Sequence, residues 1–226
     1  MTFHQTLMAE TADARAAMLT APLIGDALAG RLDVPTYAAY LTQAFHHVKH
    51  TVPLLMQTGA RLSDEQEWLR EAIAEYIEEE TGHHEWVLND IAACGYDKEK
   101  ARRSQPNPAT ELMVAYAWDL VSRVDPVGFF GMVLVLEGTS VGVASQAADA
   151  IQQSTGLPDT AFSYLRSHGA LDMEHIVFFE RLMNRIDQPA DQARIVHSAR
   201  MFYRLFGDTL RAVDPVQAGA LEREFA

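Results

Sequence analysis

Glu137 is a single carboxylate at the end of an apolar run, and its setting is the strongest chemical signal in this sequence. The run Met132–Leu136 precedes it directly and Gly138 follows it. A buried carboxylate without a partner is strongly disfavoured, so such a group is normally paired, hydrogen-bonded or bound to a metal. We therefore treat Glu137 as a candidate metal ligand.

A second segment places three ionisable side chains at helical spacing. It reads His168-x3-Asp172-x2-His175. Residues three, four and seven positions apart share one face of an α-helix, so these three side chains are expected to point together into the core. The same face carries apolar neighbours on both sides, namely Leu165, Phe179 and Leu182.

A third segment combines carboxylates with two adjacent histidines. Glu80 is followed by His83 at E-x2-H spacing and by His84 at E-x3-H spacing. On one continuous helix, Glu80 and His84 lie centrally on an apolar stripe and His83 lies toward its edge, whereas the E-x2-H spacing favours His83. Glu78 and Glu79 lie further round the helix and are expected to be solvated.

These residue types suit one kind of metal chemistry. Carboxylate and imidazole ligands favour iron or manganese over softer metals, and no thiolate accompanies them. Di-iron sites in helical bundles use glutamates together with Glu-x-x-His motifs. Glu80-x2-His83 and Asp172-x2-His175 are two such acidic-x2-His units. Glu137 could bridge two metals, and Asp172 belongs to one of the acidic-x2-His units. Glu137 and Asp172 are therefore the candidate catalytic residues.

Each motif alone also has a structural explanation. A single core-facing histidine is usually a hydrogen-bonded structural residue, and an acidic run is usually a solvated helix face. Three separate segments with inward-facing ligand types are harder to explain in that way, so we favour the metal site.

Other polar residues are weaker candidates. His47 shares an apolar stripe with Tyr40, so both are expected to line a substrate pocket, with His84 as a further pocket residue. His46 and His50 fall toward the outer face and are expected at the surface. Cys94 is expected beside a helix C-terminus, where the helix dipole disfavours a thiolate, so a nucleophilic role is not expected.

Composition narrows the class of protein. The 226 residues carry a formal charge of −13, which argues against binding to nucleic acid and to anionic membranes. A single cysteine excludes a disulfide framework within one chain. The N-terminal residues do not read as a signal peptide, and we expect no stretch that is apolar and uncharged enough to span a bilayer. We expect a cytoplasmic protein.

Helical periodicity runs through the whole sequence and predicts one all-α domain over residues 1–226, with about seven helices. We expect helices from Phe3 to Leu19, from Asp33 to about Leu62, and from a capping box at Ser63 to Cys94–Gly95. Residues 96–106 should form a loop. Further helices should begin at Asn107–Pro108 and at Asp125–Pro126. Breaks at Gly156–Pro158 and Asp187–Pro189 should separate the last three helices from one another.

The chain resembles the haem-oxygenase-like di-iron oxidases and oxygenases, which share their fold with TenA-type proteins and the pyrroloquinoline quinone synthase. The resemblance rests on the His168-x3-Asp172-x2-His175 helix together with Glu137, on the Glu79–His83 segment, and on the Gln43-x2-His46-His47 helix with Pro53 beyond it. It covers nearly the whole chain and implies a haem-oxygenase-like helical bundle. It also implies iron ligands at Glu80, His83, Glu137, His168, Asp172 and His175. The resemblance thus favours His83, and His84 is kept as the alternative.

By this resemblance the chain is expected to activate dioxygen with a di-iron cofactor, or with manganese or partly occupied iron, and to oxidise a fatty acid, an amino acid or an amine. Alternatives are a TenA-like hydrolase, a cofactorless oxidase like the quinone synthase, and a non-catalytic helical binding or regulatory protein. True haem oxygenase is less favoured, because the glycine-rich helix that this family places over haem is not evident. Expected partners are a small-molecule substrate, dioxygen and a second copy in a homodimer, with neither nucleic acid nor membrane.

Overall fold

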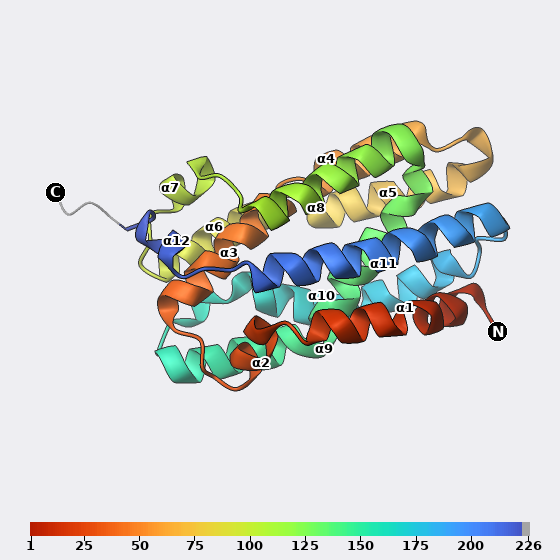
Figure 1. Cartoon of the computed structure of the whole chain (residues 1–226). Coiled ribbons are helices and arrows are strands. Elements are labelled where there is room, and N and C mark those ends of the chain that lie inside the picture. Colours follow the sequence, from red (N-terminus) through yellow and green to blue (C-terminus); the bar gives the residue numbers. More distant parts are fainter. Residues whose placement is uncertain (223–226) are drawn as a thin grey trace.

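The computed structural model describes residues 1–222, without the side chains of residues 139–142 and 168–175. Residues 1–222 form an all-α bundle with no β-strand. The long helices run roughly along one axis, and the N-terminus and the short helix α12 lie at opposite ends of the bundle (Figure 1). The helices are α1 (Phe3–Leu19), α2 (Pro22–Leu28), α3 (Val34–Val48), α4 (Thr51–Arg61), α5 (Glu67–Glu80), α6 (His83–Ala93), α7 (Lys98–Arg103), α8 (Pro108–Asp119), α9 (Phe129–Thr155), α10 (Ser163–Met183), α11 (Pro189–Arg211) and α12 (Val216–Gly219).

Local capping explains why most helices begin and end where the sequence predicts. The Asp33 and Asn107 side chains accept hydrogen bonds from backbone N–H groups at the starts of α3 and α8. Ser63 forms the expected capping box, here on the short turn before α5. Gly156 ends α9 with φ +71°, a conformation that glycine adopts without strain.

The described residues contain more helices than the seven expected, because two long helices are broken. The helix expected from Asp33 to Leu62 divides into α3 and α4, with Pro53 in the first turn of α4. A proline there lacks the N–H that a continuous helix would need. The helix expected from Ser63 to Cys94 divides at Thr81–Gly82, where Gly82 has φ +98°. In addition, the expected loop 96–106 contains α7.

Helix α9 is the longest described helix and packs against α2, α10 and α11. Contrary to the expectation above, the stretch Pro126–Thr155, which contains α9, is long and apolar enough to cross a membrane by length and composition, the one such stretch within residues 1–222. The mean hydropathy of the window is 1.7, but 71% of that window is buried inside the protein. Such burial is typical of the core helix of a folded protein.

Asp90 connects α6 to the start of α10. The fully buried Asp90 carboxylate accepts hydrogen bonds from the backbone N–H of Tyr164 at 2.8 Å and of Ser163 at 3.2 Å, and from the Ser163 hydroxyl. The first residues of α10 lack a cap from their own segment, so this carboxylate supplies the missing acceptor from another helix. It thereby fixes the beginning of the helix that carries His168, Asp172 and His175.

Candidate functional site

An apolar cavity of about 150 Å³ lies where two clusters of buried side chains meet. Helices α2, α3, α4, α5, α9, α10 and α11 all contribute to its wall. Most of the wall is aliphatic or aromatic, including Leu23, Ile24, Leu55, Met132, Leu136, Ile151, Phe206 and Leu210. Such a cavity suits the apolar portion of a small ligand.

Two carboxylates interrupt this apolar wall. Glu80 is the last residue of α5, its side chain is 12% exposed, and it lines the cavity together with Glu137 of α9. The two residues are far apart in sequence, so the fold alone brings them to one cavity. The Oε2 atom of Glu137 is inaccessible to solvent. Carboxylates placed this way can bind a hard or borderline metal cation.

His83 lies directly beside Glu80. Its Nδ1 atom is 3.0 Å from Oε2 of Glu80, its side chain is 3% exposed, and its ring lies tilted by 30° against that of Trp86 with centroids 4.1 Å apart. The turn at Thr81–Gly82 separates the two residues into different helices yet keeps their side chains together. The described structure therefore brings Glu80, His83 and Glu137 to one region of the bundle.

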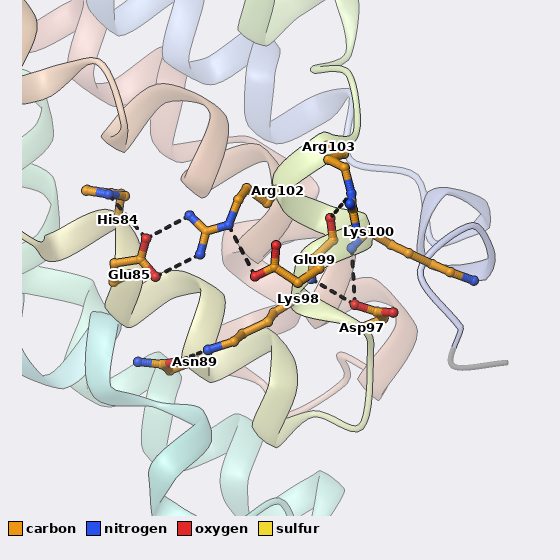
Figure 2. Close-up of polar contacts among 9 residues, drawn as sticks. All are labelled: His84, Glu85, Asn89, Asp97, Lys98, Glu99, Lys100, Arg102 and Arg103. Carbon is orange, nitrogen blue, oxygen red and sulfur yellow. Dashed lines mark hydrogen bonds and ion pairs between the residues drawn. The ribbon is translucent and has the colours of Figure 1, made fainter. Parts of the chain in front are cut away.

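His84 occupies a different place from the one expected. Its side chain is 39% exposed, it pairs with Glu85 at 3.4 Å, and it does not line the apolar cavity. Figure 2 shows it beside the surface network in which Arg102 donates two hydrogen bonds to Glu85, at 2.7 and 2.9 Å. The expectation that His84 is a pocket residue was wrong. The break at Thr81–Gly82 turns the helix, so the periodicity of α5 does not continue into α6.

The three ligand candidates of α10 lie outside the described side chains. His168, Asp172 and His175 belong to the segment 168–175, so their roles stay predictions. Among the side chains that the structure does describe, no group of three or more His, Cys, Asp or Glu residues could hold a metal ion. The described donors supply only part of the expected ligand set, and their oxygen and nitrogen chemistry fits iron or manganese.

Two of the expected pocket residues do line the cavity. They are Tyr40 and His47, both on α3. The His47 ring is buried and packs edge-on against Phe206 with centroids 6.0 Å apart. Burial raises the pKa of Tyr40 to about 12, so its hydroxyl stays protonated near neutral pH.

Tyr76 was not singled out as a site residue, although it lies on the apolar stripe of α5. It lines the cavity, and its pKa is raised well above the ordinary value, first by burial and then by the negative charge of Glu137. The charge of Glu80 contributes in the same direction. Its neutral phenol is therefore a hydrogen-bond donor beside both carboxylates. A tyrosine at helical spacing from Glu80 was the only sequence signal for it.

Cys94 lies at the C-cap of α6 and does not line the cavity. Burial raises the pKa of its thiol to about 12, so a thiolate does not form near neutral pH. Its place agrees with the expectation, and it does not supply the nucleophile that a TenA-like hydrolase would need at the cavity.

His46 and His50 were expected at the surface, and for His46 this was wrong. His46 is 1% exposed. Lys49 Nζ donates to its Nδ1 at 3.2 Å, so the ring donates from Nε2 to the Ser104 hydroxyl at 2.9 Å. His50 is half-buried and accepts a hydrogen bond from the Trp118 indole at 3.3 Å. Both histidines tie α3 and α4 to neighbouring segments, which their own helix periodicity could not indicate.

Protonation of His46 should destabilise the fold at acid pH. Burial, followed by the charge of Lys49, lowers the pKa of His46 from 6.5 to about 4. The unfolded chain therefore binds this proton more readily, and stability should fall as the pH drops from about 6.5 to about 4, by about 3 kcal/mol in total. Urea unfolding of wild type and His46→Gln at both pH values measures this loss. The variant should lose less stability than wild type, whereas exposed His197→Gln should behave like wild type. An equal loss in all three proteins would contradict the assignment.

Comparison with known proteins identifies the family. Residues 38–207, most of the chain, match the family described as iron-containing redox enzyme. The chain belongs to this family. Among curated proteins, none matches the chain. The membership accords with the donors found here, because the iron-containing redox family needs metal ligands and the cavity wall supplies carboxylates beside a buried histidine.

Similar solved structures of other proteins show which fold this member of the iron-containing redox enzyme family has. A domain of unknown function with a haem oxygenase-like fold from Shewanella denitrificans aligns with a TM-score of 0.86 and 23% identity, over 100% of this chain and 99% of its own. A TenA homologue from Pseudomonas syringae gives 0.77 and 14%, over 95% and 93% of the two chains. Haem oxygenase-1 from Synechocystis, solved with haem, gives 0.75 and 11%, over 96% of each. The haem oxygenase-like fold is thereby confirmed.

Proposed function

We propose that this protein is a non-haem di-iron oxidase or oxygenase that uses dioxygen to oxidise a small organic substrate. The observation that supports this most directly is the convergence of Glu80 and Glu137, from separate helices, on one otherwise apolar cavity, with His83 at 3.0 Å from Glu80. Bound iron would supply one-electron redox chemistry and the activation of dioxygen.

Residues from several helices would hold the two metals. Glu80 and His83 would hold one metal with donors from the sequence-predicted set His168, Asp172 and His175, and Glu137 would bridge to the second. Glu80 and Glu137 lie on helices α5 and α9, and donors held on helices keep their positions better than donors on loops as the charge of the site changes.

The rest of the cavity would hold the substrate and exclude water. The aliphatic wall leaves few polar groups to retain solvent beside the carboxylates. His47 and Tyr40 would bind the polar part of the substrate, and the protonated hydroxyl of Tyr76 would donate a hydrogen bond beside Glu137. The proposed substrate classes are a fatty acid, an amino acid or an amine.

Metal analysis of protein purified without oxygen tests the proposal. Protein from iron-supplied cells should retain or rebind about two Fe(II) per chain, show no haem absorption, and consume dioxygen when a matching substrate is added. Metal-free protein should not consume dioxygen. Substrate oxidation by the metal-free protein would favour a cofactorless oxidase like the quinone synthase. A protein that neither binds iron nor consumes dioxygen would favour the non-catalytic binding role.

Asp172→Ala and His175→Ala should each reduce the bound iron without unfolding the protein. Each change removes one donor from a site that tolerates a vacancy, unlike the loss of a large core side chain. Iron content and circular dichroism would be measured on each variant, with exposed His197→Ala as the matched control. If both variants kept full iron content and full oxygen consumption, the two residues would have to be structural.

A further inference from the structure

A second cavity of about 290 Å³ lies on another side of α9, between α1, α10 and α11. Val133 and Glu137 of α9 line both this cavity and the apolar cavity described above. Most of its remaining wall is apolar and includes Met8, Leu134 and Phe179. Glu137 thus separates two spaces in the bundle.

Among the side chains that the structure describes, the polar groups of this second cavity are Arg15, His4, Tyr203 and Glu137. Arg15 of α1 is half-exposed, which places it toward the outside, whereas Oε2 of Glu137 is inaccessible to solvent. His4 has its own neighbours, since its ring lies 3.8 Å from Glu180 and packs edge-on against Phe179. The described wall of the cavity therefore combines a half-exposed cation, apolar side chains and a buried carboxylate oxygen.

Arg15 differs from most arginines of this chain because it has no carboxylate partner. Arg31, Arg102 and Arg200, for example, each bind an acidic side chain. Within the described part of the chain, Arg15 forms neither a hydrogen bond nor an ion pair. Its charge acts on the buried Tyr203, where it opposes the rise in pKa that burial causes. The chain carries a net charge of −13, and Arg15 is nevertheless a cation at this cavity with no acidic partner among the described residues.

We propose that the second cavity binds a small organic acid, with its carboxylate on Arg15 and its apolar carbon skeleton along Met8, Leu134 and Phe179. A planar guanidinium binds a carboxylate through two parallel hydrogen bonds, which a neutral or cationic ligand cannot form. A ligand carboxylate on the half-exposed Arg15 would be separated by its own carbon skeleton from the like charge of Glu137.

Binding of an organic acid at this site would define the substrate class of the proposed oxidase or oxygenase. This catalytic use of the site rests on the proposed function. The skeleton of the bound acid would extend from Arg15 toward Glu137, the residue shared with the apolar cavity. Among the proposed substrates this favours those that carry a carboxylate over simple amines. The binding itself needs no metal.

Calorimetric titration of the metal-free protein with hexanoate tests the site. Hexanoate should bind, Arg15→Gln should weaken binding about tenfold or more, and Arg15→Lys should weaken it less because the charge remains. Arg123→Gln is the matched control, because Arg123 is largely exposed and pairs with Asp119 of its own segment. Hexanol and hexylamine, of the same length, should bind more weakly than hexanoate.

The proposal would be overturned by undetectable hexanoate binding, by equal affinity in wild type and Arg15→Gln, or by hexanol binding as tightly as hexanoate. The last result would mean that apolar contact alone drives binding. Because these titrations use metal-free protein, their outcome is independent of the iron measurements. Hexanoate binding without iron binding would refute the di-iron function only, and iron binding with an unchanged Arg15→Gln affinity would refute the acid site only.

Discussion

Glu137→Gln should bind about one Fe(II) where wild type binds about two, and its reaction with dioxygen should slow at least about tenfold. Glutamine keeps the shape of the side chain but removes the negative charge that a bridge between two cations requires. The position of Glu137 at the wall of both cavities makes this carboxylate central to the proposed site. Anaerobic Fe(II) titration followed by rapid mixing with oxygen would measure both effects.

The stability of the metal-free variant separates a ligand role from a structural one. If Glu137 serves the metal, removing a largely buried charge should leave the metal-free protein equally stable or more stable. If it serves the fold, the metal-free variant should be less stable. Glu78→Gln is the matched control, since Glu78 is an exposed carboxylate on α5 and should change neither iron binding nor stability. Equal iron stoichiometry and unchanged oxygen reactivity in Glu137→Gln would refute the bridging role.

Gly131→Ala should destabilise the protein by about 3 kcal/mol, although alanine normally favours a helix. A Cβ atom on Gly131 would lie 2.5 Å from the backbone nitrogen of Ala199 and 3.0 Å from the carbonyl oxygen of Ile195. It would also meet the Ser198 hydroxyl, which donates a hydrogen bond to the Gly128 carbonyl at 2.7 Å. Helices α9 and α11 would have to move apart, because rotation of a side chain cannot relieve a clash with backbone.

Gly25→Ala is the matched control for this change. Gly25 lies within α2, and a Cβ atom there would meet nothing within 4 Å. The same substitution should therefore stabilise the protein by about 0.5–1 kcal/mol. Urea denaturation midpoints of the two variants and wild type would show the opposite signs. A Gly131→Ala protein as stable as wild type would mean that α9 and α11 are not as closely packed as described.

The helical architecture could be predicted from the sequence because its signals are local. A cap such as Asp33 or Asn107 acts on backbone groups within three residues of itself, and Gly156 ends α9 through its own φ angle. The apolar setting of Glu137 is likewise visible in five consecutive residues before it. The haem oxygenase-like fold followed from a resemblance that spans nearly the whole chain, and the solved structures confirm it.

The place of a residue could not be predicted in this way where it depends on a break within a helix or on contact with a distant segment. Periodicity assumes a continuous helix, so the turn at Thr81–Gly82 reversed the expected places of His83 and His84. His46 is buried because the segment around Ser104 covers it, about sixty residues further along the chain. Contacts between distant segments leave no periodic pattern in the sequence of either segment.

The kinds of side chain available for chemistry, and most of the helix ends, could be predicted from the sequence because they depend on residue type and short-range hydrogen bonds. Tertiary structure alone decided that Glu80 and Glu137 share one cavity and that Arg15 lines a second one next to Glu137. It also decided that Asp90 caps α10. These arrangements depend on how helices far apart in sequence pack, which is set by the burial of the whole core rather than by any one segment.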